Sequence, residues 1–315
     1  MVATVALGAA LTTTPGRAAA LAPGGVSVVP SAAPAYTDDA PDPDVVRVPS
    51  GDAGTQYYAF TTGTTVAGYL QALCASGAGA PDAGWAPCPG TDDGASALPR
   101  PPSWQQLATQ NAPGVYRWAG TWIMFYTAAR AGHRGNTGAN CLSVATSTDL
   151  SPQHPAFTDT SAGPLLCDAA LGGAIDPIPF VDPADGRPYL VWKSNDGGSA
   201  QPARLWSQPL GPDGRTLVGQ PRLLQVQDTV HHPFETTIEN PQLVSSGGGY
   251  VLLFSTGIWN SSSYGETAVR CDGPAGPCDE PVGGPFLTSG GDAQGRGGGM
   301  LFTDDAGSWH LAYGA

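Results

Sequence analysis

Ala40-Pro-Asp-Pro-Asp-Val-Val-Arg-Val48 is followed, after a turn rich in Gly, Asp and Ser, by Tyr57-Tyr-Ala-Phe-Thr-Thr62. β-Branched and aromatic residues dominate both apolar segments, and turn-forming residues bound them, which is typical of short β-strands. The Asp42-Pro43 step stands directly before the first strand. We therefore predict two consecutive strands of an antiparallel sheet, the first opened by Asp42.

Variants of this unit return four more times along the chain. In each, a short apolar strand comes first, a turn follows, and a second strand ends in a small polar or an aromatic residue. The second strands cover residues 57–62, 121–127, 188–194, 250–255 and 308–313. Four of the first strands open with an X-Pro step, at Asp42, Ala112, Asp176 and Asn240, and the fifth opens with glycines around Gly298.

The five strand starts lie 58 to 70 residues apart, with 64 residues between Asp176 and Asn240. A period of about 64 residues suits a four-stranded propeller blade with its loops. Helical periodicity is nearly absent. We predict an all-β fold, a five-bladed β-propeller. The alternative all-β fold, a sandwich, would need strands at ~8–12-residue spacing without this longer period.

The predicted propeller occupies residues 23–315 as a single domain, and its fifth blade is incomplete at the C-terminus unless N-terminal residues supply a strand. Residues 1–22 resemble an export signal, because residues 2–11 are largely apolar and small residues around Ala20 and Ala22 offer cleavage sites. No Lys or Arg precedes the apolar run, so the match to such a signal is incomplete. We expect a secreted protein.

Six cysteines fall into three sequence-local pairs, Cys74 with Cys88, Cys141 with Cys167, and Cys271 with Cys278. Their spacing does not match that of zinc ligands. Disulfides formed in an oxidising compartment fit the pattern better. Six cysteines allow 15 pairings, and the sequence leaves the choice among them open.

The chain has a net charge of −13, with 13 Lys plus Arg among 315 residues. An acidic, Lys-poor surface argues against nucleic acid or an anionic membrane as the main partner. No apolar run reaches the ~20 residues that a membrane span needs. Hydrophobic residues make up 41% of the chain, enough for a large core, and we expect a monomer.

Acidic residues stand at or beside three of the five strand starts, at Asp42, Asp176 and Glu239. The first residues of the inner strands of a propeller face one mouth of its channel, so we expect these carboxylates to meet. Carboxylates in one pocket push their pKa values apart, which gives one proton donor and one acceptor. Hydrolysis of a glycosidic bond needs such a pair. The alternative is that an Asp before Pro only initiates a turn, which is how we interpret Asp182.

The strand starts resemble the motifs of glycoside hydrolase family 43, over about residues 36–315. The segments that carry the resemblance are Ala40-Pro-Asp-Pro-Asp-Val-Val-Arg-Val48, Ala174-Ile-Asp-Pro-Ile-Pro-Phe180 and Ile238-Glu-Asn-Pro-Gln-Leu-Val244. Members of that family are five-bladed propellers that hydrolyse arabinosides, xylosides and related sugars with inversion. The resemblance implies that Asp42 is the general base, Glu239 the general acid, and Asp176 the residue that tunes the pKa of the acid and orients it. Inverting enzymes hold the acid and base carboxyl groups ~6.5–9.5 Å apart, which leaves room for the attacking water.

Several further side chains are candidates for binding the sugar. Phe60, Trp104 and Trp259 offer flat apolar faces to a sugar ring. Asn111 stands at the position where members of glycoside hydrolase family 43 usually have a Trp. Arg296 lies in a region from which an Arg contacts the substrate in some relatives.

The fifth blade of the family usually carries a Gly-His pair whose His supports a metal in the central channel. The corresponding segment here, Gly295-Arg-Gly-Gly-Gly-Met300, has no His. We therefore expect no required cofactor and no metal ligand in this chain, with a channel calcium as the open alternative.

These features together predict a secreted, inverting α-L-arabinofuranosidase that acts on arabinose- or xylose-containing polysaccharide or oligosaccharide. β-Xylosidase and galactofuranosidase activities are alternatives, and so is a carbohydrate-binding propeller without catalysis. The invertase group of five-bladed propellers opens with Asn-Asp-Pro, whereas Pro41 precedes Asp42 here.

Overall fold

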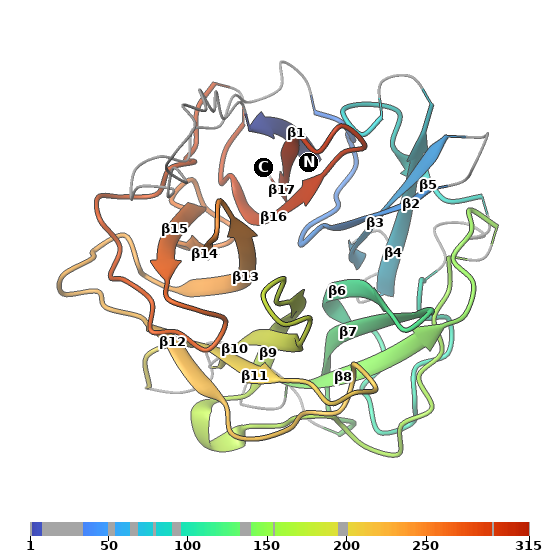
Figure 1. Ribbon diagram of the computed structural model, residues 1–315, viewed down its shortest axis with the longest axis horizontal. Helices are drawn as coiled ribbons and strands as arrows, with labels where there is room; N and C mark the ends of the chain where they lie inside the picture. The colour runs from blue at the N-terminus through green and yellow to red at the C-terminus, as the bar shows by residue number, and fades with distance from the viewer. Residues whose placement is uncertain are drawn as a thin grey trace.

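The computed structural model describes residues 2–7, 34–49, 54–63, 69–77, 80–89, 96–132, 140–153, 155–194, 201–291 and 293–314. Within these ranges the chain forms five antiparallel sheets arranged around a central axis (Figure 1). The one helical element within the described ranges is a 3₁₀ turn at Ala169–Leu171. The predicted all-β, five-bladed propeller is confirmed.

The strands follow the predicted repeat in chain order. Blade one contains β2 (Asp44–Pro49), β3 (Thr55–Gly63), β4 (Tyr69–Ser76) and β5 (Ala86–Pro87). Blade two contains β6 (Asn111–Trp118), β7 (Thr121–Ala129) and β8 (Asn140–Ser147). Blade three contains β9 (Ala174–Val181), β10 (Pro188–Ser194), β11 (Arg204–Pro209) and β12 (Arg222–Val226). Blade four contains β13 (Ile238–Ser246), β14 (Gly249–Thr256) and β15 (Gly265–Cys271).

Blade five combines segments from both ends of the described chain. It contains β16 (Gly297–Thr303), β17 (Trp309–Gly314) and β1 (Val2–Leu7), and β1 pairs with β17 in antiparallel register (Figure 1). A strand from the N-terminal region is what the repeat required to extend this blade. The export signal predicted for residues 1–22 involves the same segment, and it stays a prediction because most of those residues lie outside the described ranges.

The inner strands form a closed ring around the axis. β2 contacts β6, β6 contacts β9, β9 contacts β13, β13 contacts β16, and β16 contacts β2. Apolar side chains fill the space between neighbouring blades, as where Tyr58 and Phe60 of β3 pack with Met124 and Tyr126 of β7. Each blade thus buries both faces of its sheet against its neighbours.

Each inner strand has a residue in the left-handed backbone conformation within two residues of its first residue. The five residues are Asp42 (φ 52°), Ala112 (φ 45°), Asp176 (φ 57°), Asn240 (φ 49°) and Gly298 (φ 66°). Four of them are not glycine, and such residues adopt positive φ only at a cost in free energy. In blades two to five the ladder register shifts next to this residue, which marks a β-bulge. The X-Pro steps of the sequence therefore mark a repeated backbone kink at the start of the inner strand.

Hydroxyl groups of the preceding blade hold three of these kinks in place. In each case the backbone N–H of the left-handed residue donates to the Thr or Ser near the end of the neighbouring blade's second strand. The three bonds are Ala112 N to Thr62 Oγ1 (2.9 Å), Asp176 N to Thr127 Oγ1 (3.0 Å) and Gly298 N to Ser255 Oγ (2.8 Å). The small polar residue that ends the repeated second strand thus ties one blade to the next.

Three disulfides close loops at the periphery of the blades. They join Cys74 to Cys88, Cys141 to Cys167, and Cys271 to Cys278, which is the nearest-neighbour pairing. Of the helices in the described ranges, none is long and apolar enough to cross a membrane.

Asp44, two residues after the first kink, is a buried acid that joins blades one and two. Its side chain is 7% exposed, and Oδ2 accepts a hydrogen bond from the backbone N–H of Val115 (2.5 Å). Burial raises the pKa of this carboxyl to about 7, although the Val115 N–H acts in the opposite direction. The folded protein therefore holds this proton more tightly than the unfolded chain does.

Asp44→Asn is expected to flatten the pH dependence of stability. The contribution of Asp44 to stability falls as the pH rises from its ordinary pKa of 3.8 to about 7, because ionisation is disfavoured only in the folded state. Thermal unfolding at pH 4 and pH 8 should show that the wild type loses a few degrees more in Tm than Asp44→Asn over that interval. Asp272→Asn, at an exposed position, is the control. Equal losses in wild type and Asp44→Asn would contradict the assignment.

Candidate active site

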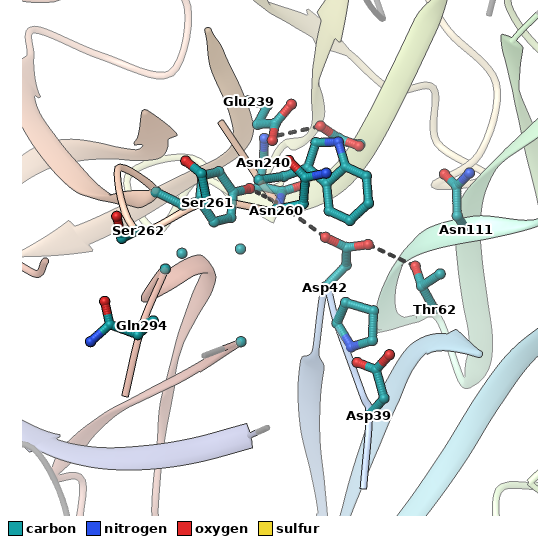
Figure 2. Close-up of a pocket in the computed structure, with 18 residues that line it drawn as sticks. Asp39, Asp42, Thr62, Asn111, Glu239, Asn240, Asn260, Ser261, Ser262 and Gln294 are labelled. Atoms are coloured by element: carbon teal, nitrogen blue, oxygen red, sulfur yellow. Dashed lines mark hydrogen bonds between the residues drawn. The ribbon is translucent and has the colours of Figure 1, made fainter. Parts of the chain in front are cut away.

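A cavity of about 650 Å³ opens at the end of the propeller axis where the inner strands begin. Four of the five left-handed residues line it, and Asn240 and Asp42 lie side by side within it (Figure 2). The loop between β14 and β15, the segment before β16 and the segment before β2 supply most of the other lining residues. The kinks therefore turn residues from distant parts of the chain towards one volume.

Four carboxyl groups line this cavity: Asp39, which the sequence did not single out, and three from the strand starts of three different blades (Figure 2). Asp42, Asp176 and Glu239 all line it, as the positions in the repeat predicted. Asp42 and Asp176 are themselves left-handed residues, while Glu239 immediately precedes one. The common backbone geometry brings side chains together although they lie up to 197 residues apart in the sequence.

Asp42 receives one hydrogen bond on each carboxyl oxygen. Thr62 Oγ1 donates to Oδ2 (2.7 Å), and Asn240 Nδ2 donates to Oδ1 (3.1 Å) (Figure 2). Burial raises the pKa of Asp42, and the negative charge of Glu239 acts in the same direction, while the two donors oppose it. A carboxylate with a raised pKa is a stronger base once ionised, and each oxygen retains a free lone pair for a water molecule.

Asp176 connects blades three and four beneath the cavity. Its side chain is buried, and Oδ2 accepts a hydrogen bond from the backbone N–H of Asn240 (3.0 Å). Burial raises the pKa of Asp176, the positive charge of Lys193 counteracts this effect, and Glu239 and Asp42 add to the rise. Asp176 thereby fixes the backbone that carries both Glu239 and Asn240.

Glu239 forms an ion pair with Lys193 on β10, with Nζ 2.9 Å from Oε2. The two side chains are 12% and 4% exposed, so both charges are nearly removed from solvent. A buried ammonium needs such a partner, since an isolated buried charge costs many kcal/mol. Lys193 is the single lysine in the 315-residue sequence, and its position within the apolar strand Pro188–Ser194 is the signal by which it could have been found.

Asn240 links the Asp42 carboxyl to Tyr264. Its Nδ2 donates to Asp42 Oδ1 and also lies 3.1 Å from the Tyr264 hydroxyl oxygen. Burial raises the pKa of Tyr264 well above its ordinary value, with the negative charges of Glu239 and Asp42 as further causes. The Tyr264 hydroxyl therefore stays protonated, and it can accept from Asn240 while donating elsewhere.

Two of the five predicted sugar-binding residues lie at the cavity. Asn111 lines its wall, and its Nδ2 donates to the Thr109 carbonyl (3.2 Å) (Figure 2). Trp259 lines its rim, and its side chain is 70% exposed. No pattern in the sequence indicated the polar side chains beside Trp259 at the rim, which are Asn260, Ser261, Ser262 and Gln294 (Figure 2).

The other three predicted residues lie away from the cavity. Phe60 is fully buried between blades one and two, where its ring packs against Phe157. Trp104 packs against the same core and donates from Nε1 to Ser161 Oγ (3.0 Å). The Arg296 guanidinium turns to the Gly290 carbonyl instead of the cavity. Strand pairing and local loop hydrogen bonds, which the sequence does not reveal, direct these three side chains elsewhere.

Within the part of the chain that the structure describes, the residues near the central channel do not fit a metal ion. The described residues contain no group of three or more His, Cys, Asp or Glu placed to hold an ion. The first residues of β16 are glycines, and a Cβ on Gly299 would lie 2.8 Å from Glu266 Cδ, so that Glu266 already fills this space. No step of a mechanism is therefore assigned to a metal.

A sequence model of the family described as "Glycosyl hydrolases family 43" matches residues 32–315. A curated relative, Beta-D-galactofuranosidase xynD from Aspergillus niger, is 31% identical over 179 residues, which are 55% of this chain and 46% of the relative. This chain thus spans less than half the length of that protein.

Two solved structures share the architecture across most of the chain. A thermostable family-43 glycoside hydrolase is 21% identical, with a TM-score of 0.69 over 87% of this chain and 83% of that one. The endo-arabinase from Bacteroides thetaiotaomicron is 20% identical, with a TM-score of 0.65 over 87% of this chain and 88% of that one. At these identities the likeness supports the fold and not the substrate.

Lys193→Met is expected to lower the free energy of unfolding by about 3 kcal/mol at pH 7, because it leaves Glu239 as an uncompensated, nearly buried charge. The double variant Lys193→Met/Glu239→Gln should recover most of that loss, since the charge that lacks a partner is removed as well. Urea unfolding of the two single variants and the double variant measures the coupling. Strictly additive losses would mean that the pair is not coupled.

Proposed function

The chain belongs to glycosyl hydrolase family 43, and on that premise we propose that it hydrolyses terminal glycosidic bonds with inversion. Asp42 acts as the general base, Glu239 as the general acid, and Asp176 as the residue that orients the acid. The observation that supports this most strongly is the meeting of three carboxyl groups from blades one, three and four in one cavity, each in a different hydrogen-bond environment.

Proton transfer is divided between the two sides of the cavity. For this step Glu239 takes up a proton on Oε1 while Oε2 stays bonded to Lys193, and it gives that proton to the oxygen of the leaving group as the bond to the sugar breaks. Asp42 accepts a proton from a water molecule that attacks the anomeric carbon from the opposite face. Thr62 and Asn240 hold the Asp42 carboxylate so that a free lone pair is left for that water.

Asp176 and Lys193 position the acid from beneath. Asp176 accepts the backbone N–H of Asn240, the residue after Glu239, and so fixes the start of β13. Lys193 holds Glu239 Oε2, which leaves Oε1 as the oxygen that can carry the proton to the substrate. The same Asn240 donates to Asp42, so one residue sets the relative position of base and acid.

The substrate we propose is a terminal α-L-arabinofuranosyl group on a polysaccharide or oligosaccharide. A cavity of about 650 Å³ has the size of a small-molecule pocket and suits one or two sugar rings. The exposed indole of Trp259 at the rim supplies an aromatic face for the C–H side of a sugar. Three disulfides are compatible with a secreted enzyme.

A β-D-galactofuranosyl group is the second candidate, because the curated relative is named a β-D-galactofuranosidase. The two sugars share a five-membered ring, and the galactose form carries a longer exocyclic arm. β-D-Xyloside hydrolysis and sugar binding without catalysis are the further alternatives. Assay of the purified protein against aryl α-L-arabinofuranoside, β-D-galactofuranoside and β-D-xyloside separates all four.

Asp42→Asn should lower kcat on the preferred aryl glycoside by about 10³-fold, because a neutral amide cannot take the proton from water. Glu239→Gln should cost about the same with a poor leaving group, but much less with a dinitrophenyl leaving group, which needs no proton. Steady-state kinetics and NMR of the first-formed anomer measure both effects. Asp182→Asn, at the Asp-Pro step that does not line the cavity, is the matched control and should keep its kcat. Unchanged turnover in Asp42→Asn or a retained anomeric configuration would contradict the mechanism.

Removal of metal ions should leave the reaction unaffected, because no proposed step uses a metal. Dialysis against EDTA is expected to leave kcat within about twofold of the untreated enzyme. Loss of activity that added Ca²⁺ restores, and Mg²⁺ does not, would show that a calcium ion is required.

A further inference from the structure

Glu266 is a buried carboxyl group that the proposed mechanism does not use. It lies on β15 directly opposite Ser255 of β14, and its side chain is 0% exposed. Oε1 accepts hydrogen bonds from Ser255 Oγ (2.7 Å) and from the backbone N–H of Gly299 (2.6 Å). Oε2 is enclosed and has no hydrogen-bond partner among the described residues.

Comparison with the other blades shows that the fold does not require a carboxyl group here. Three second strands carry the hydroxyl that captures the next blade's kink, and each such residue has a cross-strand neighbour on the third strand. The three pairs are Thr62 with Leu70, Thr127 with Leu142, and Ser255 with Glu266. All three third-strand side chains are 0% exposed. Leucine is what packing favours, and a buried carboxyl group in its place costs desolvation free energy.

Glu266 contacts the backbone that faces Asp42. Ser255, which Glu266 Oε1 holds, accepts the N–H of Gly298 (2.8 Å). Gly298 lies against the base, since a Cβ at this position would be 3.4 Å from Asp42 Oδ1 and 3.3 Å from Asn240 Nδ2. The start of β16 is therefore enclosed between Glu266 on one side and the Asp42–Asn240 pair on the other.

The burial of Glu266 also determines whether its carboxyl group is charged. Burial raises its pKa to about 7, and the negative charge of Glu239 adds to the rise, while Ser255 and Gly299 oppose it. Below that pH the group holds a proton. A protonated carboxyl group can accept both hydrogen bonds on Oε1 without adding a negative charge near the acid and the base.

We propose that Glu266 is a positioning residue for the hydrolysis. Its neutral carboxyl group fixes Ser255 and the backbone of Gly298 and Gly299, and through them it holds the side chains of Asp42 and Asn240 in place at the cavity. The proposal rests on the function proposed above for the same cavity. Glu266 touches neither substrate nor water in this role and acts through the backbone of blade five.

Two substitutions separate the acceptor role of Glu266 from its charge. Glu266→Gln keeps an oxygen that accepts both hydrogen bonds, and its kcat should stay within about threefold of the wild type. Glu266→Leu copies blades one and two, and kcat should fall about 10- to 100-fold, with KM changed by less than about threefold and Tm not lowered. Glu235→Gln, at the other buried glutamate, is the control and should keep its kcat. Full kcat in Glu266→Leu, or an equal loss in Glu266→Gln, would overturn the proposal.

A titration provides a second test that needs no turnover. The sequence has only four glutamates, so ¹³Cδ labelling of glutamate gives four carboxyl signals, and the one that Glu266→Gln removes is assigned. That signal should titrate near pH 7. Titration near the ordinary value of 4.5 would show an ionised group at neutral pH and overturn the neutral role.

Crystal structures of the wild type and Glu266→Leu complete the test. The Leu variant has no acceptor for the Gly299 N–H, so the backbone of Gly298 and Gly299 and the Asp42 carboxyl should shift, whereas unchanged positions would overturn the proposal. An inactive wild type with these shifts would refute the assigned hydrolysis and leave the positioning intact, so the two failures are distinguishable.

Discussion

The hydrogen bond from a left-handed strand start to a hydroxyl group of the preceding blade is the interaction on which the propeller depends. A positive φ at a non-glycine residue is unfavourable by itself, and it persists only where surrounding contacts hold it. Here the kink exposes a backbone N–H that the strand ladder does not use, and Thr62, Thr127 or Ser255 accepts it. These three kinks are therefore stabilised by the neighbouring blade, which couples blade packing to the geometry of the cavity.

The fourth blade departs from this arrangement, and the departure creates the site. By its place in the repeat, Ser194 would accept the N–H of Asn240. The Asp176 carboxylate accepts it instead (3.0 Å), and Ser194 Oγ accepts from Trp206 Nε1 (3.0 Å). One hydrogen bond of the ring is thus made by an acid that also faces Glu239 and Lys193. Asp176 therefore has two roles: it holds the backbone kink of blade four, and it lines the cavity.

The parts of this arrangement that depend on periodicity could be predicted from the sequence. Equivalent backbone positions in a repeat occupy equivalent positions in space, so the X-Pro steps located all three carboxyl groups. Side-chain direction could not be predicted in the same way, because a shift of one residue moves a strand side chain to the other face. Phe60 pairs across the sheet with Asp44 and points into the core between blades one and two. The directions of the Trp104 and Arg296 side chains depend on the paths of loops, and loops show no sequence periodicity from which a path can be predicted.

Contacts between blades could not be predicted from the sequence either, but for a different reason. The Lys193–Glu239 pair joins residues 46 positions apart on different strands, and no local pattern indicates that they meet. The same applies to Glu266, whose position opposite Ser255 is visible only once the strands are in register. A single lysine in an acidic chain was the one available clue, because a lone buried cation must find a carboxylate.

The carboxyl groups around the cavity share one buried positive charge, so their environments must differ for the site to work. Lys193 lies next to Glu239 and within the field of Asp176. Among the described residues, the donors to Asp42 are the neutral Thr62 and Asn240, and Glu266 has two donors on one oxygen and none on the other. These buried groups cannot all be ionised at once, because like charges removed from water repel strongly. Which group keeps a proton depends first on its burial and then on the charges and donors around it, and the same strand starts that build the propeller fix both.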